Sequence, residues 1–114
     1  MKNVVLEKSF SFAARIVKLN QHLKAKKKEF CISRQLLRCG TSIGANITEA
    51  QQAQSRADFV SKLNIALKEA EETSYWLRLL HTTNYLTDTE FQSIFSDCQE
   101  IKFLLIAIVK SIKK

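Results

Sequence analysis

The segment from residue 33 to residue 53 constrains the fold of this chain more than any other. Its apolar residues recur at helical spacing, but small or polar residues stand where a helix core normally holds large side chains. These residues are Gly40, Thr41, Ser42, Gly44, Ala45, Asn46 and Thr48. A glycine inside a helix costs about 1 kcal/mol relative to alanine. We therefore expect a neighbouring helix to pack closely against Gly40 and Gly44, because such packing offsets the cost.

The remainder of the chain favours helices over strands. It contains no proline and only two glycines, so few positions could form the tight turns of a β-protein. A chain of 114 residues can bury enough surface for one core. We predict an all-α fold and a single domain over residues 1–114.

The first two helices are predicted from their apolar periodicity. One spans residues 4–24, and the other spans residues 33–54 with Ser33 as its N-cap. The apolar stripe of the first consists of Val5, Phe12, Ile16, Leu19 and Leu23, flanked by Leu6, Phe10, Ala13 and Val17. The stripe of the second consists of Leu36, Gly40, Ile43, Ile47 and Ala50.

Capping patterns mark the start of two further helices. Ser55 and Asp58 form a capping-box variant that opens a helix over residues 56–82. Thr87 and Glu90 form a capping box and begin a fourth helix that runs almost to the end of the chain. The short connections make consecutive helices antiparallel. We therefore predict an antiparallel up-down-up-down four-helix bundle.

The third helix carries a second apolar patch in addition to its core stripe. Ile65, Trp76 and Leu79 gather roughly 100° away from that stripe on a helical wheel. A helix in a monomeric bundle needs one buried face, and aromatic residues are enriched at subunit interfaces. We interpret the patch as an oligomer interface, to which Phe103 and Ile106 of the fourth helix can add. The alternative is a wide core stripe that wraps further around the third helix.

The net charge of +7 is concentrated at the start of the sequence. In residues 1–28 the only acidic residue is Glu7, whereas the rest of the chain balances its basic residues with acidic ones. A basic ridge therefore follows the first helix and the connection after it. Its members are Lys8, Arg15, Lys18, Lys24, Lys26, Lys27 and Lys28. The alternative interpretation is a solvated helix exterior that keeps the protein soluble.

Residues that carry catalytic or metal chemistry are sparse. Cys31, Cys39 and Cys98 form no C-x-x-C pair, which argues against a disulfide framework and a zinc site and favours a reducing cytoplasm. Neither His22 nor His81 has a partner at metal-ligand spacing. The longest apolar run is too short for a membrane span. We expect no catalytic residue, no metal, no cofactor and no membrane segment.

Several sequence runs resemble the 23S rRNA intervening-sequence proteins, also known as the four-helix-bundle protein family. They are S-I-G-A-N-I-T-E-A at residues 42–50, S-R-A-D-F at 55–59, L-N-I-A-L-K-E-A-E-E-T at 63–73 and N-Y-L-T-D-T-E-F at 84–91. The family usually has proline in place of Gly44 and glycine in place of Ala50. Whether the second helix bends at Gly44 is therefore open.

The resemblance implies a cytoplasmic bacterial four-helix bundle that assembles as a ring-shaped homopentamer and has no enzymatic activity. The chain is also similar to the accessory variability proteins of diversity-generating retroelements. In those proteins a positively charged pentameric barrel engages nucleic acid and a reverse transcriptase.

Two functional hypotheses follow. The leading one is a non-catalytic oligomeric scaffold that binds RNA or DNA through phosphate contacts with the basic ridge. We expect salt-sensitive, sequence-tolerant binding without base-specific recognition, because no exposed aromatic residue is interleaved with the basic ones. The alternative is a scaffold that recruits a protein partner and leaves the ridge as ordinary surface. In both hypotheses, the polar residues Asn46 and Glu49 set helix or subunit register. A third hypothesis is a catalytic site around these two residues.

Overall fold

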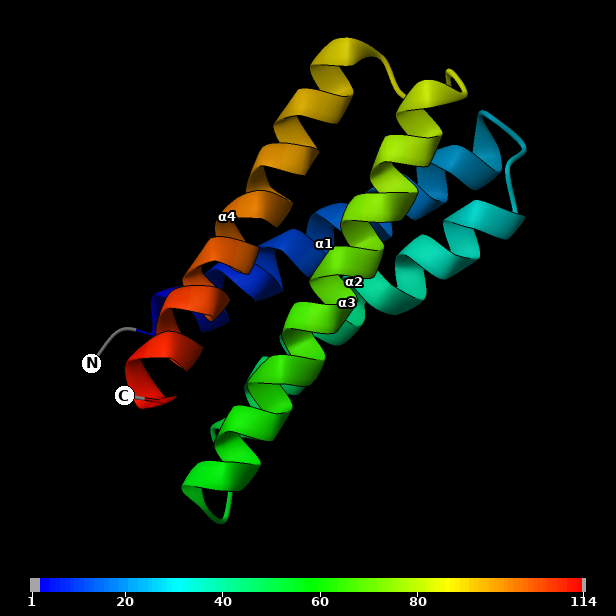
Figure 1. Ribbon diagram of the computed structural model, residues 1–114. Coiled ribbons are helices and arrows are strands. Elements are labelled where there is room, and N and C mark those ends of the chain that lie inside the picture. The colour runs from blue at the N-terminus through cyan, green and yellow to red at the C-terminus, as the bar shows by residue number, and fades with distance from the viewer. Residues whose placement is uncertain (1–2, 114) are drawn as a thin grey trace.

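Four antiparallel helices make up the computed structural model, which describes residues 3–113. They are α1 (Val4–Ala25), α2 (Cys31–Ala50), α3 (Arg56–Thr82) and α4 (Asp88–Lys113), and no strand occurs between residues 3 and 113. Consecutive helices are neighbours, and α4 returns to lie beside α1 (Figure 1). The predicted all-α, up-down-up-down bundle is confirmed.

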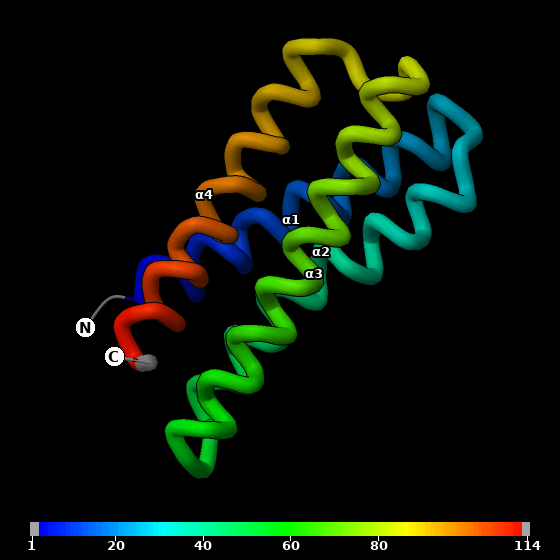
Figure 2. Tube along the Cα trace, viewed as in Figure 1, coloured from blue at the N-terminus to red at the C-terminus, as the bar shows by residue number. Residues whose placement is uncertain are grey.

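The two ends of the bundle differ in what they contain. The trace in Figure 2 places the α1–α2 and α3–α4 turns at one end, with the α2–α3 turn at the other. The start of α1 and the end of α4 also lie at that other end (Figure 1). The lysine-rich α1–α2 turn is therefore remote from the first turn of α1.

The predicted starts of α3 and α4 are confirmed by their caps. At α3, the Asp58 N–H donates to Ser55 Oγ over 3.0 Å. At α4 the capping box is reciprocal: the Thr87 N–H donates to Glu90 Oε1 over 2.8 Å, and the Glu90 N–H donates to Thr87 Oγ1 over 3.2 Å. These side chains satisfy N–H groups that lack a partner within the helix.

The predicted start of α2 at Ser33 is wrong, because the cap is the side chain of Glu29. Its carboxylate accepts from the N–H groups of Cys31, Ile32 and Ser33 at 3.2, 3.1 and 2.7 Å. Ser33 lies buried inside the first turn, where its Oγ donates to the Glu29 carbonyl oxygen over 2.8 Å. The helix can therefore begin two residues earlier than the serine pattern indicates.

The end of α2 also differs from the prediction, which placed it at residue 54. The helix ends at Ala50, and the Ala53 N–H donates to the Ala50 carbonyl oxygen in the turn that follows. Ser55 is already extended as the N-cap of α3, so the chain has to reverse direction between these residues. Residues 51–54, which were predicted to be helical, form this reversal instead.

Helix α1 packs directly on the two glycines of α2. A Cβ atom built on Gly40 would lie 2.9 Å from side-chain atoms of Ile16, and one on Gly44 would lie 3.3 Å from the Ser9 carbonyl oxygen. The first distance is shorter than a real Cβ contact, and Ile16 is fully buried. Helix α2 continues without a break through Gly44.

The core lies along the axis of the bundle and draws on all four helices. Its largest fully buried side chains include Phe12, Ile16, Leu36, Ile43, Leu63, Leu77, Ile101 and Leu105. Phe10 and Val17 do not belong to it, contrary to the predicted stripe of the first helix, because they are 77% and 39% exposed. Phe10 instead lies beside an open groove lined by Ala13, Thr41, Gly44, Ala45, Thr48 and Glu49. The small side chains of α2 are too short to cover its ring.

We predict that the Glu29 cap contributes measurably to stability. Replacing Glu29 with alanine should lower the free energy of unfolding by about 1–2 kcal/mol, because three N–H groups lose their acceptor. Glu29→Gln keeps one carbonyl oxygen and should lose less. Urea unfolding followed by circular dichroism measures both variants.

The matched control for this prediction is Glu100→Ala, which removes a carboxylate from an exposed ion pair and should cost less than about 1 kcal/mol. Equal unfolding midpoints for Glu29→Ala and the wild type would contradict the assigned cap.

Candidate nucleic-acid interface

The basic ridge separates into two groups in the folded chain. Lys8 Nζ lies 3.2 Å from the Glu100 carboxylate, and an Arg15 guanidinium nitrogen lies 2.6 Å from Asp97 Oδ2. Arg15 also donates to the Oγ and the carbonyl oxygen of Ser93. These partners belong to α4, so Lys8 and Arg15 bridge α1 to α4 and their charges are offset within the chain.

The second group carries charges that have no acidic partner. Lys18, Lys24, Lys26, Lys27 and Lys28 are all exposed, and none forms an ion pair within residues 3–113. Arg34, in the first turns of α2, is likewise exposed and unpaired there. We use the term basic tip for Lys24, Lys26, Lys27, Lys28 and Arg34. This surface occupies the end of the bundle where α1 turns into α2.

The backbone of the α1–α2 turn holds the basic tip in a defined shape. The Lys26 N–H donates to the His22 carbonyl oxygen over 2.9 Å, and the Glu29 N–H donates to the Leu23 carbonyl oxygen over 3.0 Å. Lys28 has a φ of 55°, in the left-handed region that reverses the chain between these bonds. The turn is therefore closed by hydrogen bonds on both sides of its lysines.

Glu29 is the acidic residue of this turn, but its carboxylate caps α2 and forms no ion pair with the lysines. Glu29 is only 8% exposed, and its two oxygens accept from the first N–H groups of α2. On α4, the pKa of Glu90 is lowered chiefly by the N–H of Thr87, with smaller contributions from the charges of His22 and Lys27. The positive charge of Lys27 is therefore felt by one acid of α4, with which it forms no ion pair.

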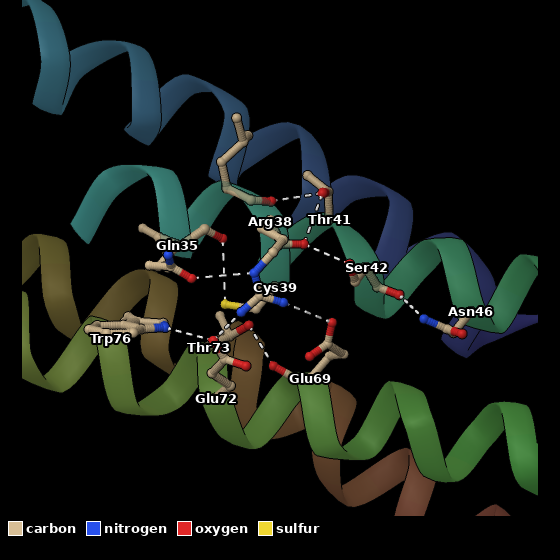
Figure 3. Close-up of polar contacts among 12 residues, drawn as sticks. Gln35, Arg38, Cys39, Thr41, Ser42, Asn46, Glu69, Glu72, Thr73 and Trp76 are labelled. Carbon is tan, nitrogen blue, oxygen red and sulfur yellow. Dashed lines mark hydrogen bonds and ion pairs between the residues drawn. The ribbon is translucent and has the colours of Figure 1, made fainter. Parts of the chain in front are cut away.

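The residues predicted to set register lie near the end of α2, away from the basic tip at its start. Glu49 Oε1 lies 3.0 Å from Lys62 Nζ and so links α2 to α3. Asn46 donates from Nδ2 to the Ser42 carbonyl oxygen over 2.8 Å, which is a contact within α2 (Figure 3). Glu49 therefore has a contact that can align two helices, whereas the hydrogen bond of Asn46 stays within its own helix.

A larger polar cluster joins α2 to α3 at Arg38. Its guanidinium pairs with Glu72 and lies 3.4 Å from Glu69, while Trp76 Nε1 donates to the Glu72 carboxylate over 3.0 Å (Figure 3). Sequence patterns did not indicate this cluster, because its residues come from two helices and only their alignment brings them together. The positive charge of Arg38 is taken up by two carboxylates.

The predicted interface residues differ in exposure. Ile65 is 42% exposed, whereas Trp76 and Leu79 are half-buried and Trp76 packs against the core. On α4, Phe103 is 59% exposed and Ile106 is half-buried. Part of the patch therefore agrees with the alternative of a wide core stripe, and Ile65 and Phe103 are the members that lie open. Its role as an oligomer interface stays a prediction.

The comparisons with known proteins identify the family. Residues 1–107 match the family described as 23S rRNA-intervening sequence protein. The chain belongs to this family. A protein of unknown function from the S23 ribosomal protein family of Bacteroides thetaiotaomicron VPI-5482, solved by crystallography, has 60% sequence identity and a TM-score of 0.92. The match covers 93% of this chain and 98% of that chain, and no curated protein matches.

One exposed residue of this 23S rRNA-intervening sequence protein was missed by the sequence reasoning. Phe30, two residues after the last lysine of the α1–α2 turn, is 51% exposed and is the N-cap residue of α2. The expectation that no exposed aromatic residue accompanies the basic ones is therefore wrong. The available signal was its position in a connection, where neither helical stripe can bury it.

The thiols of Cys39 and Cys98 and the imidazole of His81 are each engaged in contacts within the bundle. Burial raises the pKa of the Cys39 thiol to about 11 and that of Cys98 to about 12. His81 Nε2 lies 2.7 Å from Asp88 and its ring stacks on Phe91. Between residues 3 and 113 no group of three potential ligands could hold a metal ion, and none of the helices combines the length and apolarity of a bilayer span.

We predict that only one thiol of the native protein reacts quickly with a disulfide reagent. At about pH 8 the exposed Cys31 should react, whereas Cys39 and Cys98 hold few thiolates because their pKa values are raised. Titration with Ellman's reagent measures this. Cys31→Ser should abolish the fast phase, and unfolding in guanidinium should release all three thiols of the wild type. Two or more fast equivalents in the native wild type would contradict the assigned burial.

Proposed function

We propose that this 23S rRNA-intervening sequence protein is a non-catalytic homo-oligomeric scaffold that binds RNA through phosphate contacts with the basic tip. The supporting observation is the unpaired charge of Lys24, Lys26, Lys27, Lys28 and Arg34. The acid nearest to them in sequence, Glu29, is used to cap α2. Cations without partners can exchange their counterions for phosphates, and that release drives non-specific nucleic-acid binding.

The proposal assigns a smaller role to the first part of the ridge. Lys8 and Arg15 would have to leave Glu100 and Asp97 before they could contact a phosphate. Lys18 is exposed and unpaired between residues 3 and 113, and it can extend the path of the nucleic acid along α1. The family name refers to sequences that intervene in 23S rRNA, which makes RNA the first nucleic acid to test.

We predict that binding depends on the lysines of the turn and on salt. Replacing Lys26, Lys27 and Lys28 with alanine should weaken RNA binding by at least about tenfold. It should also reduce the slope of log K against log salt by roughly 2, since each lost contact to a single strand contributes about 0.7. Fluorescence anisotropy between about 50 and 200 mM salt gives both quantities.

The control for this prediction is a triple alanine variant at Arg56, Lys68 and Lys110, which removes the same formal charge from exposed positions on α3 and α4. Unchanged affinity after the lysine substitutions would refute the proposed site. Equal losses in both variants would show that net charge, and not the basic tip, causes the binding.

Assembly is the second part of the proposal. The exposed apolar residues Ile65 and Phe103 supply surface that a second copy can cover. The family resemblance implies five copies, and each copy would add one basic tip to a shared electrostatic field. A ring would therefore bind phosphate chains more strongly than a single bundle.

We predict that mass measurement in solution gives a multiple of 13.1 kDa. Ile65→Glu should weaken assembly because it places a charge in the covered surface. Trp76→Glu should also do so, but it additionally disturbs the core and the bond to Glu72, so Ile65→Glu is the cleaner variant. Lys68→Glu on the same helix is the matched control. A wild type that is monomeric at all concentrations would contradict the prediction.

The competing proposal is a scaffold that recruits a protein partner. It draws on the groove beside Phe10, a ring that is 77% exposed next to the small residues of α2. A stoichiometric protein retained from nuclease-treated lysate, and lost with Phe10→Ser, would favour this function over RNA binding.

A further inference from the structure

Phe30 places an aromatic ring within the basic tip. It follows Lys28 by two residues, so their Cα atoms lie within about 7 Å of each other. It is the N-cap residue of α2 and precedes Arg34 by four residues, about one helical turn. Cations that can hold phosphates therefore lie both before and after this exposed ring along the chain.

The backbone on both sides of this ring is fixed. Before Phe30, the Glu29 N–H donates to the Leu23 carbonyl oxygen over 3.0 Å. After it, the N–H groups of Cys31 and Ile32 donate to the Glu29 carboxylate. A residue whose backbone is already held loses less conformational freedom when a ligand stacks on its ring.

The ring of Phe30 is not packed into the core of the bundle. It is 51% exposed, whereas the apolar residues of the first turns of α2, Ile32 and Leu36, are half-buried and fully buried. The core of the bundle thus leaves about half of this ring available to a ligand.

We infer that Phe30 is a stacking platform for an unpaired base, and that the basic tip takes single-stranded RNA in preference to duplex RNA. This inference rests on the proposed RNA-binding function. Lysines alone hold the phosphates of either form, but a base inside a duplex is already stacked between its neighbours. An unpaired base can instead stack on the ring while its flanking phosphates contact the lysines and Arg34.

The test compares two RNA probes of equal length, a single strand that carries one 2-aminopurine and a hairpin duplex. The wild type should bind the single strand more tightly and quench the fluorescence of 2-aminopurine on binding. Phe30→Leu should weaken binding of the single strand roughly 5- to 150-fold, the range expected for one base–aromatic stack. Binding of the duplex should stay unchanged, and Phe30→Trp should restore binding of the single strand.

Tyr75→Leu is the matched control, because it removes from α3 a ring of similar exposure, 50% against 51% for Phe30, and should alter neither affinity. Equal affinity of the wild type for both probes, or single-strand binding by Phe30→Leu within twofold of the wild type, would overturn the stacking platform and leave the proposed RNA function standing. Absence of quenching in the wild-type complex would overturn it without any variant. If the wild type binds neither probe at low salt, the proposed function itself fails.

Discussion

The lysine-rich end of this protein depends on the hydrogen bonds that the Glu29 carboxylate accepts from the start of α2. The carboxylate accepts hydrogen bonds from three N–H groups, which allows α2 to begin at Cys31, directly after the turn that follows α1. The same contact withdraws the acidic residue of the turn from Lys26, Lys27 and Lys28. A single buried side chain therefore helps to fix the turn and forms no ion pair with its lysines.

Helix α1 connects this end to the remainder of the bundle through two kinds of contact. On one side it packs on the glycines of α2, where Ile16 and the backbone of Ser9 occupy the space that side chains would need. On the other side Lys8 and Arg15 pair with acids of α4. The apolar contact brings α1 close to α2, and the ion pairs add charge-assisted hydrogen bonds to α4. Lys8 and Arg15 therefore join helices, whereas the other lysines of the basic ridge form no ion pair within residues 3–113.

The sequence was most informative where structure is local. The starts of α3 and α4 depend on residues three positions apart, so their capping boxes were predicted correctly. The α2 start was missed because a glutamate reaches its N–H groups from outside the usual N-cap position. The close approach to Gly40 could be anticipated from the cost of a helical glycine, but the identity of Ile16 as its neighbour required the fold.

Properties that depend on the alignment of different helices could not be predicted. The charge excess of residues 1–28 looked uniform along the sequence, yet Asp97 and Glu100 are folded against its first part. Phe10 fitted a helical stripe, but its exposure depends on the small residues that face it from α2. Phe30 was overlooked because periodicity carries no information in a turn.

The central claim is that the α1–α2 turn is where this protein contacts RNA. Hydrogen–deuterium exchange with and without a single-stranded RNA tests it most directly, since it maps contacts without altering any residue and tolerates any oligomeric state. We predict that peptides covering residues 24–34 exchange more slowly in the complex, while the α2–α3 turn at the opposite end is unchanged. Protection at the α2–α3 turn or along the groove beside Phe10, with none in residues 24–34, would contradict the account.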